Sequence, residues 1–321
     1  MLQLKQHGIK AARFGFGEAL RDAGAKHCGL VVLGADISAS VTVSLFRDAF
    51  PDRFFSLGIA EQNCVGVMAG LALEGKLPVF STYGVFAALR TTDQIRISLC
   101  YNNLHAIIGG AHAGISVGPD GATHQALEDI AIMRALPNMT VLSPCDATQT
   151  YQATMAAVEF AKGPVYLRFG REEMPDFTTK EMGFTIGKAQ TLIPGNDVCI
   201  IATGHLVWEA VLAASELKAM NISARLINMH TIKPIDTAAI VTAARETSAI
   251  VTAEEHQITG GLGGAVAEVL SKYEPAHLEM VGMPDVFGES GKARELMEKY
   301  GLTCPAIVEA AIKVINRKIN A

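Results

Sequence analysis

The hydrophobic positions of this chain form short unbroken runs that alternate with longer segments of mixed character. Each run is too short for a helix and ends at glycine or a polar residue, as buried strands do. Strands that alternate with helices in this way indicate a parallel sheet covered on both faces. In the first half we expect strands at Leu30–Leu33, Ala106–Ile108, Thr140–Leu142 and Val165–Leu167, and helices at Phe14–Ala25, Gln62–Leu73, Leu127–Ala135 and Ala147–Ala161.

A change of rhythm at Glu172–Lys188 precedes a second series of strands and helices. This segment mixes proline and glycine with charged residues and threonines, which is typical of a linker. We therefore predict an α/β protein with two doubly wound parallel-type sheet domains, at residues 1–176 and 189–321, and a linker at 177–188. In the second domain we expect strands at Val198–Ala202, Ala224–Ile227 and Ala249–Thr252, and helices at Leu206–Lys218, Asp236–Arg245 and Leu262–Lys272.

The composition excludes several classes of protein. Half of the 321 residues are hydrophobic and 18% are charged, so the chain is not intrinsically disordered. The net charge of −5 leaves no basic surplus for nucleic acid, and no apolar run approaches the roughly 18 residues of a membrane helix. We therefore expect neither nucleic acid nor a membrane as partner. The mean hydropathy of +0.27 predicts wide cores or burial against another subunit.

The cysteines and the N-terminal sequence bear on the cellular compartment. The six cysteines form neither a CxxC pair nor the spacing of a zinc site. The sequence MLQLKQHGIKAARFG lacks the apolar stretch of a signal peptide. We therefore expect a cytoplasmic protein with reduced thiols.

A glutamate, Glu61, stands at the start of a predicted apolar helix. A carboxylate there can simply interact with the helix dipole. Alternatively, apolar surroundings formed by Phe54, Phe55 and Ile59 raise its pKa, so that it exchanges a proton near neutral pH.

A second candidate is the aromatic pair Tyr83 and Phe86, which is either core or a platform for a flat ligand.

The loop from His112 to Gln125 carries the densest polar chemistry. It follows a buried strand, and its three glycines and one proline exclude a helix. Its histidines, Asp120 and neighbouring polar side chains offer donors and acceptors suited to a polyol or a phosphate. Neither histidine has companions at metal-ligand spacing, so we expect no metal bound by this chain. Arg168 and Arg171 are either an anion clamp or partners in salt bridges.

Taken together, these clusters resemble the C-terminal half of transketolase over nearly the whole chain. The marks of the resemblance occur in the family's order and spacing, and they are Gly34-Ala35-Asp36, Ser40, Gly58-Ile59-Ala60-Glu61-Gln62, Phe86, His112 and Asp120-Gly121-Ala122-Thr123-His124-Gln125.

The resemblance implies a function for each matching residue. The activity would be transfer of a two-carbon ketol unit between sugars in the pentose phosphate or a related pathway, with thiamine diphosphate as cofactor. Glu61 would bind a ring nitrogen of the aminopyrimidine and promote loss of the thiazolium C2 proton. Phe86 would stack on the pyrimidine of the cofactor with Tyr83 beside it, and Asp36 would lie near the thiazolium side. Substrate would be held at its hydroxyls by Asp120 and His124, and at its phosphate by Arg13, Ser40, His112 and Arg171.

The sequence also departs from the family pattern. Tyr83 stands where many members have phenylalanine, and Leu89 replaces an aromatic residue, which affects the shape of the pyrimidine pocket. The family binds the cofactor diphosphate and Mg²⁺ or Ca²⁺ in another domain, through a GDG motif that this sequence lacks. The resemblance therefore implies one subunit of a split transketolase. Its partner would be an N-terminal subunit carrying the diphosphate and metal site, with two copies of each subunit in a heterotetramer.

Other functions remain open from the sequence. A subunit similar to 1-deoxyxylulose-5-phosphate synthase would share the Glu61-Gln62 pair and the Asp120–Gln125 loop, but it would have arginine in place of His112. The β subunit of a decarboxylating dehydrogenase would share the architecture without the sugar-binding loop. A non-catalytic paralogue would be expected to lose Glu61. The glycines at 260–264 do not follow the dinucleotide-binding pattern, so we expect them to allow close helix–strand packing.

Overall fold

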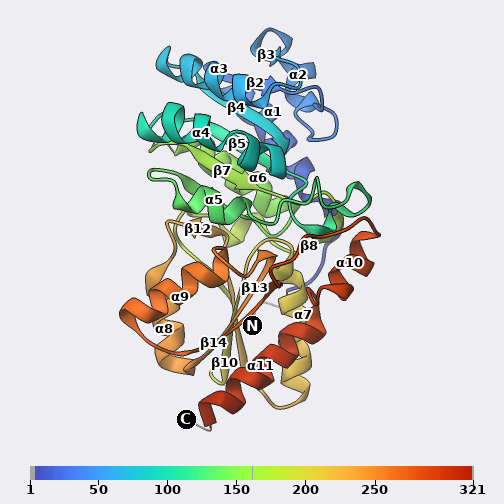
Figure 1. Ribbon diagram of the computed structural model, residues 1–321, viewed down its shortest axis with the longest axis vertical. Coiled ribbons are helices and arrows are strands. Elements are labelled where there is room, and N and C mark those ends of the chain that lie inside the picture. The colour runs from blue at the N-terminus through green and yellow to red at the C-terminus, as the bar shows by residue number, and fades with distance from the viewer. Residues whose placement is uncertain (1–3, 161, 320–321) are drawn as a thin grey trace.

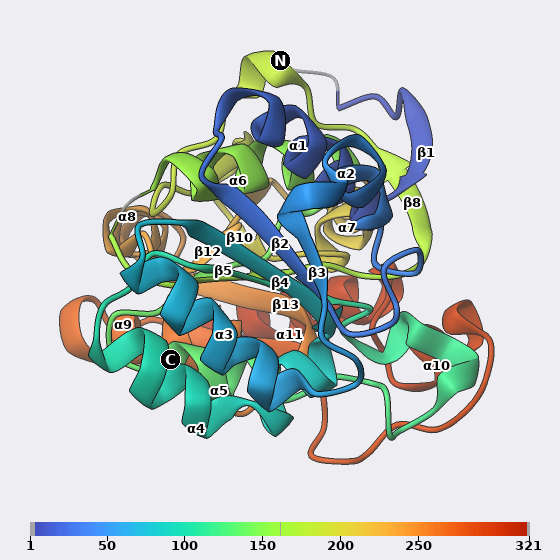
Figure 2. The same ribbon diagram turned by 90° about the horizontal axis from the view of Figure 1, so that it is seen from above.

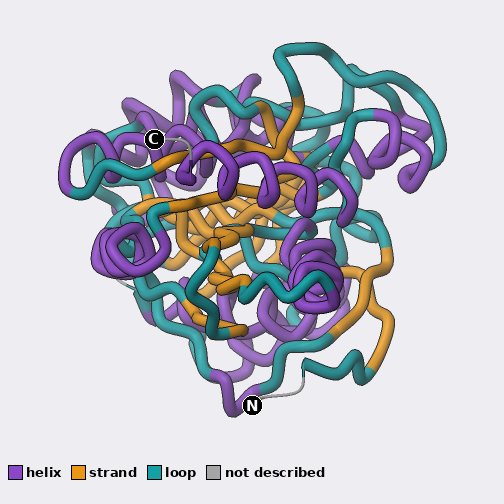
Figure 3. The backbone as a smooth tube through the Cα atoms, turned by 90° about the horizontal axis from the view of Figure 1, so that it is seen from below, coloured by secondary structure: helices purple, strands orange, loops and turns teal. Residues whose placement is uncertain are grey.

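The computed structural model describes residues 4–160 and 162–319. Two α/β domains lie one above the other along the long axis, with the N-terminal half at the top of Figure 1 and the C-terminal half below. Seen from below, the strands occupy the middle of the molecule and helices surround them (Figure 3). This is the predicted fold class.

The first sheet has seven strands, of which six are parallel. All five residues of β2 are buried, as expected for a continuous apolar run covered on both faces. The seventh strand, β12, comes from the C-terminal half and pairs antiparallel with β6. In spatial order the strands are β12 (Thr231–Lys233), β6 (Thr140–Leu142), β7 (Val165–Arg168), β5 (Ile107–Ala111), β4 (Leu77–Tyr83), β2 (Leu30–Gly34) and β3 (Phe54–Ser56).

Helices cover both faces of this sheet, as Figure 2 shows from above. One face carries α1 (Ala12–Lys26), α2 (Ser44–Ala49) and α6 (Ala147–Glu159), and the other carries α3 (Glu61–Leu73), α4 (Thr92–Gln94) and α5 (Asp129–Ala135). Two π-helical segments, η2 (Phe86–Arg90) and η3 (Ile95–Tyr101), flank α4.

The second sheet has five strands, and helices cover both of its faces. Successive residues of its central strand β10 point to opposite faces, so that Ile200 packs with α7 and α11 while Ile201 packs with α8 and α9. In spatial order the strands are β14 (His277–Met283), β13 (Ala249–Gln257), β10 (Val198–Ala202), β11 (Ala224–Asn228) and the antiparallel β9 (Gln190–Ile193), and the helices are α7 (Leu206–Ala219), α8 (Thr237–Thr247), α9 (Leu262–Tyr273) and α11 (Cys304–Ile319).

The two domains share buried contacts. One hydrophobic cluster joins Met133 and Val141 of the first domain to Ile227, Ile240 and Leu262 of the second. A short helix, α10 (Ala293–Lys299), packs against the loop segment η4 (Ile115–Asp120) of the first domain. The domains therefore form a continuous core on this side, and elements of the second domain brace the loop that carries the predicted substrate residues.

Each predicted strand and helix is present, with ends that differ by a few residues. Asp236 caps α8 by accepting a hydrogen bond from the Ala239 N–H. The predicted end of one helix at Ala161 lies outside the described residues, and α6 ends at Glu159. At the glycines of 260–264, a Cβ on Gly261 would clash with Glu254 Oε2 of β13, which confirms close packing.

Two local expectations are wrong. The sequence predicts no helix in the loop after β5, but η4 forms two short 3₁₀ turns on either side of Gly118, whose φ of +76° suits glycine. The segment Glu172–Lys188 is not irregular throughout. Its first part, β8 (Glu173–Asp176), pairs antiparallel with β1 (Gly8–Ala11), and η5 (Lys180–Met182) follows. The boundaries at 1–176, 177–188 and 189–321 stay a prediction.

Candidate functional site

The carboxyl ends of three neighbouring parallel strands bring the predicted residues together. The strands β2, β4 and β5 lie side by side in the first sheet, and Tyr83 is the last residue of β4. Asp36 follows β2, and His112 follows β5 directly. Loops at this edge of an open parallel sheet are where such folds bind ligands.

Glu61 is the first residue of α3, and only 2% of it is exposed. The sequence names Phe54, Phe55 and Ile59 as its apolar surroundings; Phe55 and Ile59 are 42% and 73% exposed, Phe54 is half-buried, and the apolar surroundings stay a prediction. Its partner is Arg90, whose Nη1 donates a hydrogen bond of 2.9 Å to Glu61 Oε2. Sequence reasoning missed Arg90, although it is the single charged residue of the segment Phe86–Arg90.

Phe86 forms an aromatic platform beside this carboxylate. The guanidinium carbon of Arg90 lies over its ring, 4.3 Å from the centroid. The ring of His124 meets Phe86 edge-on at a centroid distance of 5.3 Å, and Tyr83 is tilted against it at 6.1 Å. Thr123 Oγ1 lies 2.9 Å from His124 Nδ1, which orients the imidazole and leaves Nε2 as the nitrogen for another partner. Phe86 is thus part of this site, whereas Tyr83 both contacts the site and packs against the hydrophobic core.

His112 is buried beneath Tyr83, and the two rings stack at 4.5 Å. Its backbone has a φ of +52°, a left-handed conformation that histidine tolerates better than most residues. Arg13 Nη1 lies 3.2 Å from Nε2, and because arginine can only donate, Nε2 is the acceptor. Burial, followed by the positive charges of Arg13 and Arg171, lowers the pKa of His112 to about 4, so the ring is neutral at pH 7.

Arg171 and Asp120 form the outer part of the same cluster. Nη1 of Arg171 donates to Asp120 Oδ1 and to the Val117 carbonyl, both at 3.2 Å. Both side chains are about one-third exposed, so water screens their attraction. Ser40 joins from the loop after β2, with its Oγ 3.2 Å from Tyr83 Oη. The structure therefore brings Arg13, Ser40, His112 and Arg171 around one region.

Two candidates have other contacts. Asp36 is exposed and accepts a 3.0 Å hydrogen bond from Ser56 Oγ, which gives it no direct contact with the cluster. Arg168 is not an anion clamp, because it is 4% exposed and its Nε lies 2.9 Å from Oδ2 of the fully buried Asp129. Tyr166 also donates to this carboxylate. The salt-bridge alternative is therefore correct for Arg168.

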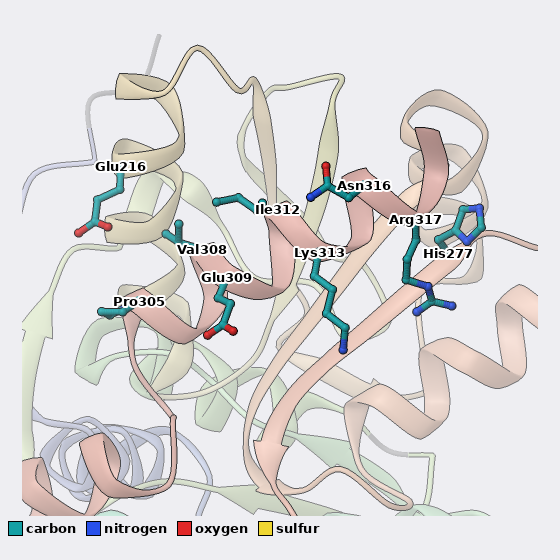
Figure 4. Close-up of a pocket in the computed structure, with 9 residues that line it drawn as sticks. All are labelled: Glu216, His277, Pro305, Val308, Glu309, Ile312, Lys313, Asn316 and Arg317. Carbon is teal, nitrogen blue, oxygen red and sulfur yellow. The ribbon is translucent and has the colours of Figure 1, made fainter. Parts of the chain in front are cut away.

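One hollow of the protein surface lies away from these residues. It is a surface groove of about 810 Å³ on the second domain, and Figure 4 shows it along α11, with Glu216 of α7 and His277 beside the helix.

Within residues 4–160 and 162–319 there is no group of three or more histidine, cysteine or acidic side chains placed to hold a metal. In the same ranges, no helix is both long and apolar enough to cross a membrane.

Two family models match the chain. The pyrimidine-binding domain of transketolase matches residues 10–176, and the C-terminal domain of transketolase matches residues 187–307. The chain belongs to the transketolase family. Members of this family use thiamine diphosphate and a divalent metal.

Several transketolase relatives match along almost their full length. A solved structure described as a split gene transketolase, an inactive beta4 tetramer, is 48% identical with a TM-score of 0.90, over 96% of this chain and 99% of that one. The 6-deoxy-6-sulfo-D-fructose transketolase subunit of Clostridium sp. strain MSTE9 is 40% identical, over 99% of this chain and 97% of its own length. An apulose-4-phosphate transketolase subunit of Phocaeicola vulgatus is 37% identical, over 96% of this chain and 98% of its own length.

The chain is also similar to part of 1-deoxy-D-xylulose-5-phosphate synthases. The 1-deoxy-D-xylulose-5-phosphate synthase of Desulfotalea psychrophila is 33% identical over 99% of this chain. This transketolase-family chain matches only 50% of that synthase.

Proposed function

We propose that this chain is the pyrimidine-binding subunit of a two-subunit transketolase. The complex would transfer a two-carbon ketol unit from a ketose donor to an aldose acceptor, at least one of them phosphorylated. The observation that carries the proposal is the buried carboxylate of Glu61, which faces a planar aromatic platform at the edge of the sheet where the polar loop of Asp120 and His124 lies.

The residues around Glu61 fit the aminopyrimidine of thiamine diphosphate. The guanidinium of Arg90 lies on Phe86 and donates to Glu61, which shows that a planar group with an N–H fits between ring and carboxylate. An aminopyrimidine offers the same flat face, with a ring nitrogen that can share a proton with Glu61. When bound, the cofactor supplies the carbon nucleophile that takes up the two-carbon unit.

The other side chains of the cluster then orient the substrate. His124 is oriented by Thr123, and its free Nε2 would contact a hydroxyl of the donor sugar. Asp120 can accept hydrogen bonds from two hydroxyls. Tyr83 stands between the platform and His112, and connects the cofactor side to the substrate side. We place Asp36 on the thiazolium side, where its exposed carboxylate can reach a bound group.

The phosphate of the substrate would lie at Arg13, Ser40, His112 and Arg171. Two arginines and a hydroxyl provide donors for a phosphate, and the neutral His112 accepts from Arg13 through Nε2 and adds no further charge. The acidic Asp120 would then turn from Arg171 toward the substrate hydroxyls. A positive cluster next to a carboxylate suits a sugar phosphate, which combines an anion with hydroxyl donors.

A partner subunit is supported by the named relatives and by the surface next to Glu61. Two of the relatives are named as transketolase subunits and match this chain over nearly their full length. Large apolar side chains are exposed just before α3, at its end and on the neighbouring segments η2 and η3, namely Ile59, Leu73, Leu89, Ile97 and Tyr101. Such a patch is typical of a protein interface. The partner would bind the diphosphate and Mg²⁺ or Ca²⁺, in a cytoplasmic heterotetramer with two copies of each subunit.

A subunit with the activity of 1-deoxyxylulose-5-phosphate synthase is the second candidate. The resemblance predicts arginine at the position of His112 in that family, whereas the buried His112 here is neutral and stacked on Tyr83. This difference favours the transketolase proposal.

The substitution Glu61→Gln tests the proposal. It removes the proton-sharing carboxylate while keeping the shape of the side chain, so exchange of the C2 proton on bound cofactor should slow by about 10²–10⁴-fold. The exchange rate is measured by NMR on the complex with the N-terminal subunit. Glu246→Gln, an exposed glutamate on α8, is the control and should exchange at the wild-type rate. Wild-type exchange in the Glu61→Gln complex would refute the role of Glu61.

A further inference from the structure

Arg90 makes two contacts at the candidate site, and both are shape-specific. The central carbon of its guanidinium lies over the Phe86 ring, 4.3 Å from the centroid. The same group donates a 2.9 Å hydrogen bond to Glu61. Phe86 and Arg90 are four residues apart on one helical segment, so their side chains share a face. One planar cation therefore joins the aromatic platform to the buried carboxylate.

These are the two contacts that the proposed function gives to the aminopyrimidine of the cofactor. Two planar groups cannot occupy the same face of Phe86 and the same carboxylate oxygen at once. The aromatic rings of Tyr83 and His124 also lie beside Phe86 and restrict the approach of a ligand ring from those directions. We infer that the guanidinium of Arg90 occupies the position of the pyrimidine ring in the cofactor-free chain and leaves this position when thiamine diphosphate binds. This inference rests on the proposed function.

The physical reason for such a substitute is the burial of Glu61. A carboxylate that is 2% exposed is destabilised if it has no hydrogen-bond donor, and the cofactor-free chain must supply one. Arginine suits this position because its planar fork both stacks on aromatic rings and pairs with carboxylates. While the cofactor is absent, Arg90 thus covers the Phe86 ring and donates a hydrogen bond to the carboxylate of Glu61.

The hold of Arg90 on the site is weak enough to be released. Its side chain is 44% exposed, so water screens the ion pair and can solvate the guanidinium after it leaves. Among the residues that the structure describes, Glu61 is its one hydrogen-bond partner. Arg90 also ends a π-helical segment and precedes Thr91, whose φ of −111° interrupts the helix. The side chain can therefore swing toward solvent without unfolding a packed element.

The test is the affinity of the assembled complex for thiamine diphosphate. Arg90→Met keeps a long side chain and removes the charge and the planar fork. If Arg90 occupies the site most of the time, its removal should lower the apparent Kd by about three- to tenfold, because a competing occupant is gone. Arg90→Lys should give a smaller decrease, since lysine can pair with Glu61 but cannot stack as a plane. The Kd is measured by calorimetry with thiamine diphosphate and Mg²⁺.

The control is Arg245→Met, which removes an arginine from another exposed ion pair, with Glu274 on the second domain. It should leave the Kd unchanged. If Arg90→Met prevents assembly, crystal structures of the wild-type complex with and without cofactor decide the question by the position of the guanidinium.

Each outcome has a distinct meaning. Tighter binding by Arg90→Met, or a guanidinium displaced from Phe86 in the cofactor complex, supports the inference. An unchanged or higher Kd with normal assembly, or a guanidinium still on Glu61 beside bound cofactor, overturns it and leaves the proposed function intact. Absence of cofactor binding by the wild-type complex would instead overturn the proposed function, and this inference with it.

Discussion

Replacement of Arg171 should separate recognition of a substrate phosphate from recognition of its hydroxyls. Arg171 is one of the four residues proposed to bind the phosphate, and it now donates to Asp120 and to the Val117 carbonyl. The phosphate of a sugar is distant from the bond being formed, so its contacts stabilise ground state and transition state equally. Arg171→Ala should therefore raise KM for a phosphorylated aldose acceptor and leave kcat nearly unchanged.

The magnitude follows from the kind of contact that is lost. A hydrogen bond to a charged group contributes about 1.5–3 kcal/mol, which corresponds to roughly a 10–150-fold increase in KM. The same substitution also removes the ion pair with Asp120. Because both partners are about one-third exposed, that pair is worth about 0.2–1 kcal/mol, or less than about sixfold. An unphosphorylated acceptor such as glycolaldehyde should show only this smaller effect.

The assay is steady-state kinetics of the reconstituted complex with both acceptors. Arg171→Lys is the matched variant, because it keeps the charge and should recover part of the affinity for the phosphorylated acceptor. Asp120→Ala should lower kcat/KM for both acceptors, since it acts on the donor sugar. Equal losses with the two acceptors for Arg171→Ala would show that the arginine only braces the loop, and would remove its support for a phosphorylated substrate.

Two further predictions concern stability. Asp129→Ala should lower the free energy of unfolding by about 3–5 kcal/mol in urea titrations, because it removes the charged partner of the buried Arg168. Glu268→Ala, which removes an exposed partner of Arg134, should lower it by less than about 1 kcal/mol. Similar losses in both variants would contradict this prediction. Below about pH 6.5 the unfolded chain protonates His112, but in the folded chain its pKa is about 4, so this residue should cost about 2 kcal/mol of stability between about pH 7 and pH 5. His112→Asn, which tolerates the positive φ, should lose correspondingly less over that range; parallel pH profiles of wild type and variant would refute the assignment.

Much of the architecture could be predicted from local sequence. The unbroken apolar run Val198–Ala202 becomes a strand with the predicted ends, because a strand covered on both faces needs hydrophobic side chains at every position. The short edge strand Thr231–Lys233 has no such pattern, and its pairing with β6 depends on how the two domains pack. The turns of η4 were missed because glycine and proline exclude an α-helix but not isolated 3₁₀ turns.

The residues of the candidate site were found by motif, but their contacts were decided by tertiary structure. Arg13 and His112 are 99 positions apart in the sequence, and Glu61 and Arg90 are 29 apart. No periodicity links such positions, since they meet only when the parallel strands align their carboxyl ends at one edge of the sheet. For the same reason the local pattern left Arg168 and Arg171 equivalent, and only the resemblance assigned Arg171 to a phosphate. The fold buries Arg168 against Asp129 inside the protein and leaves Arg171 at the partly exposed loop, because burial depends on what packs above each strand end and not on the residue type.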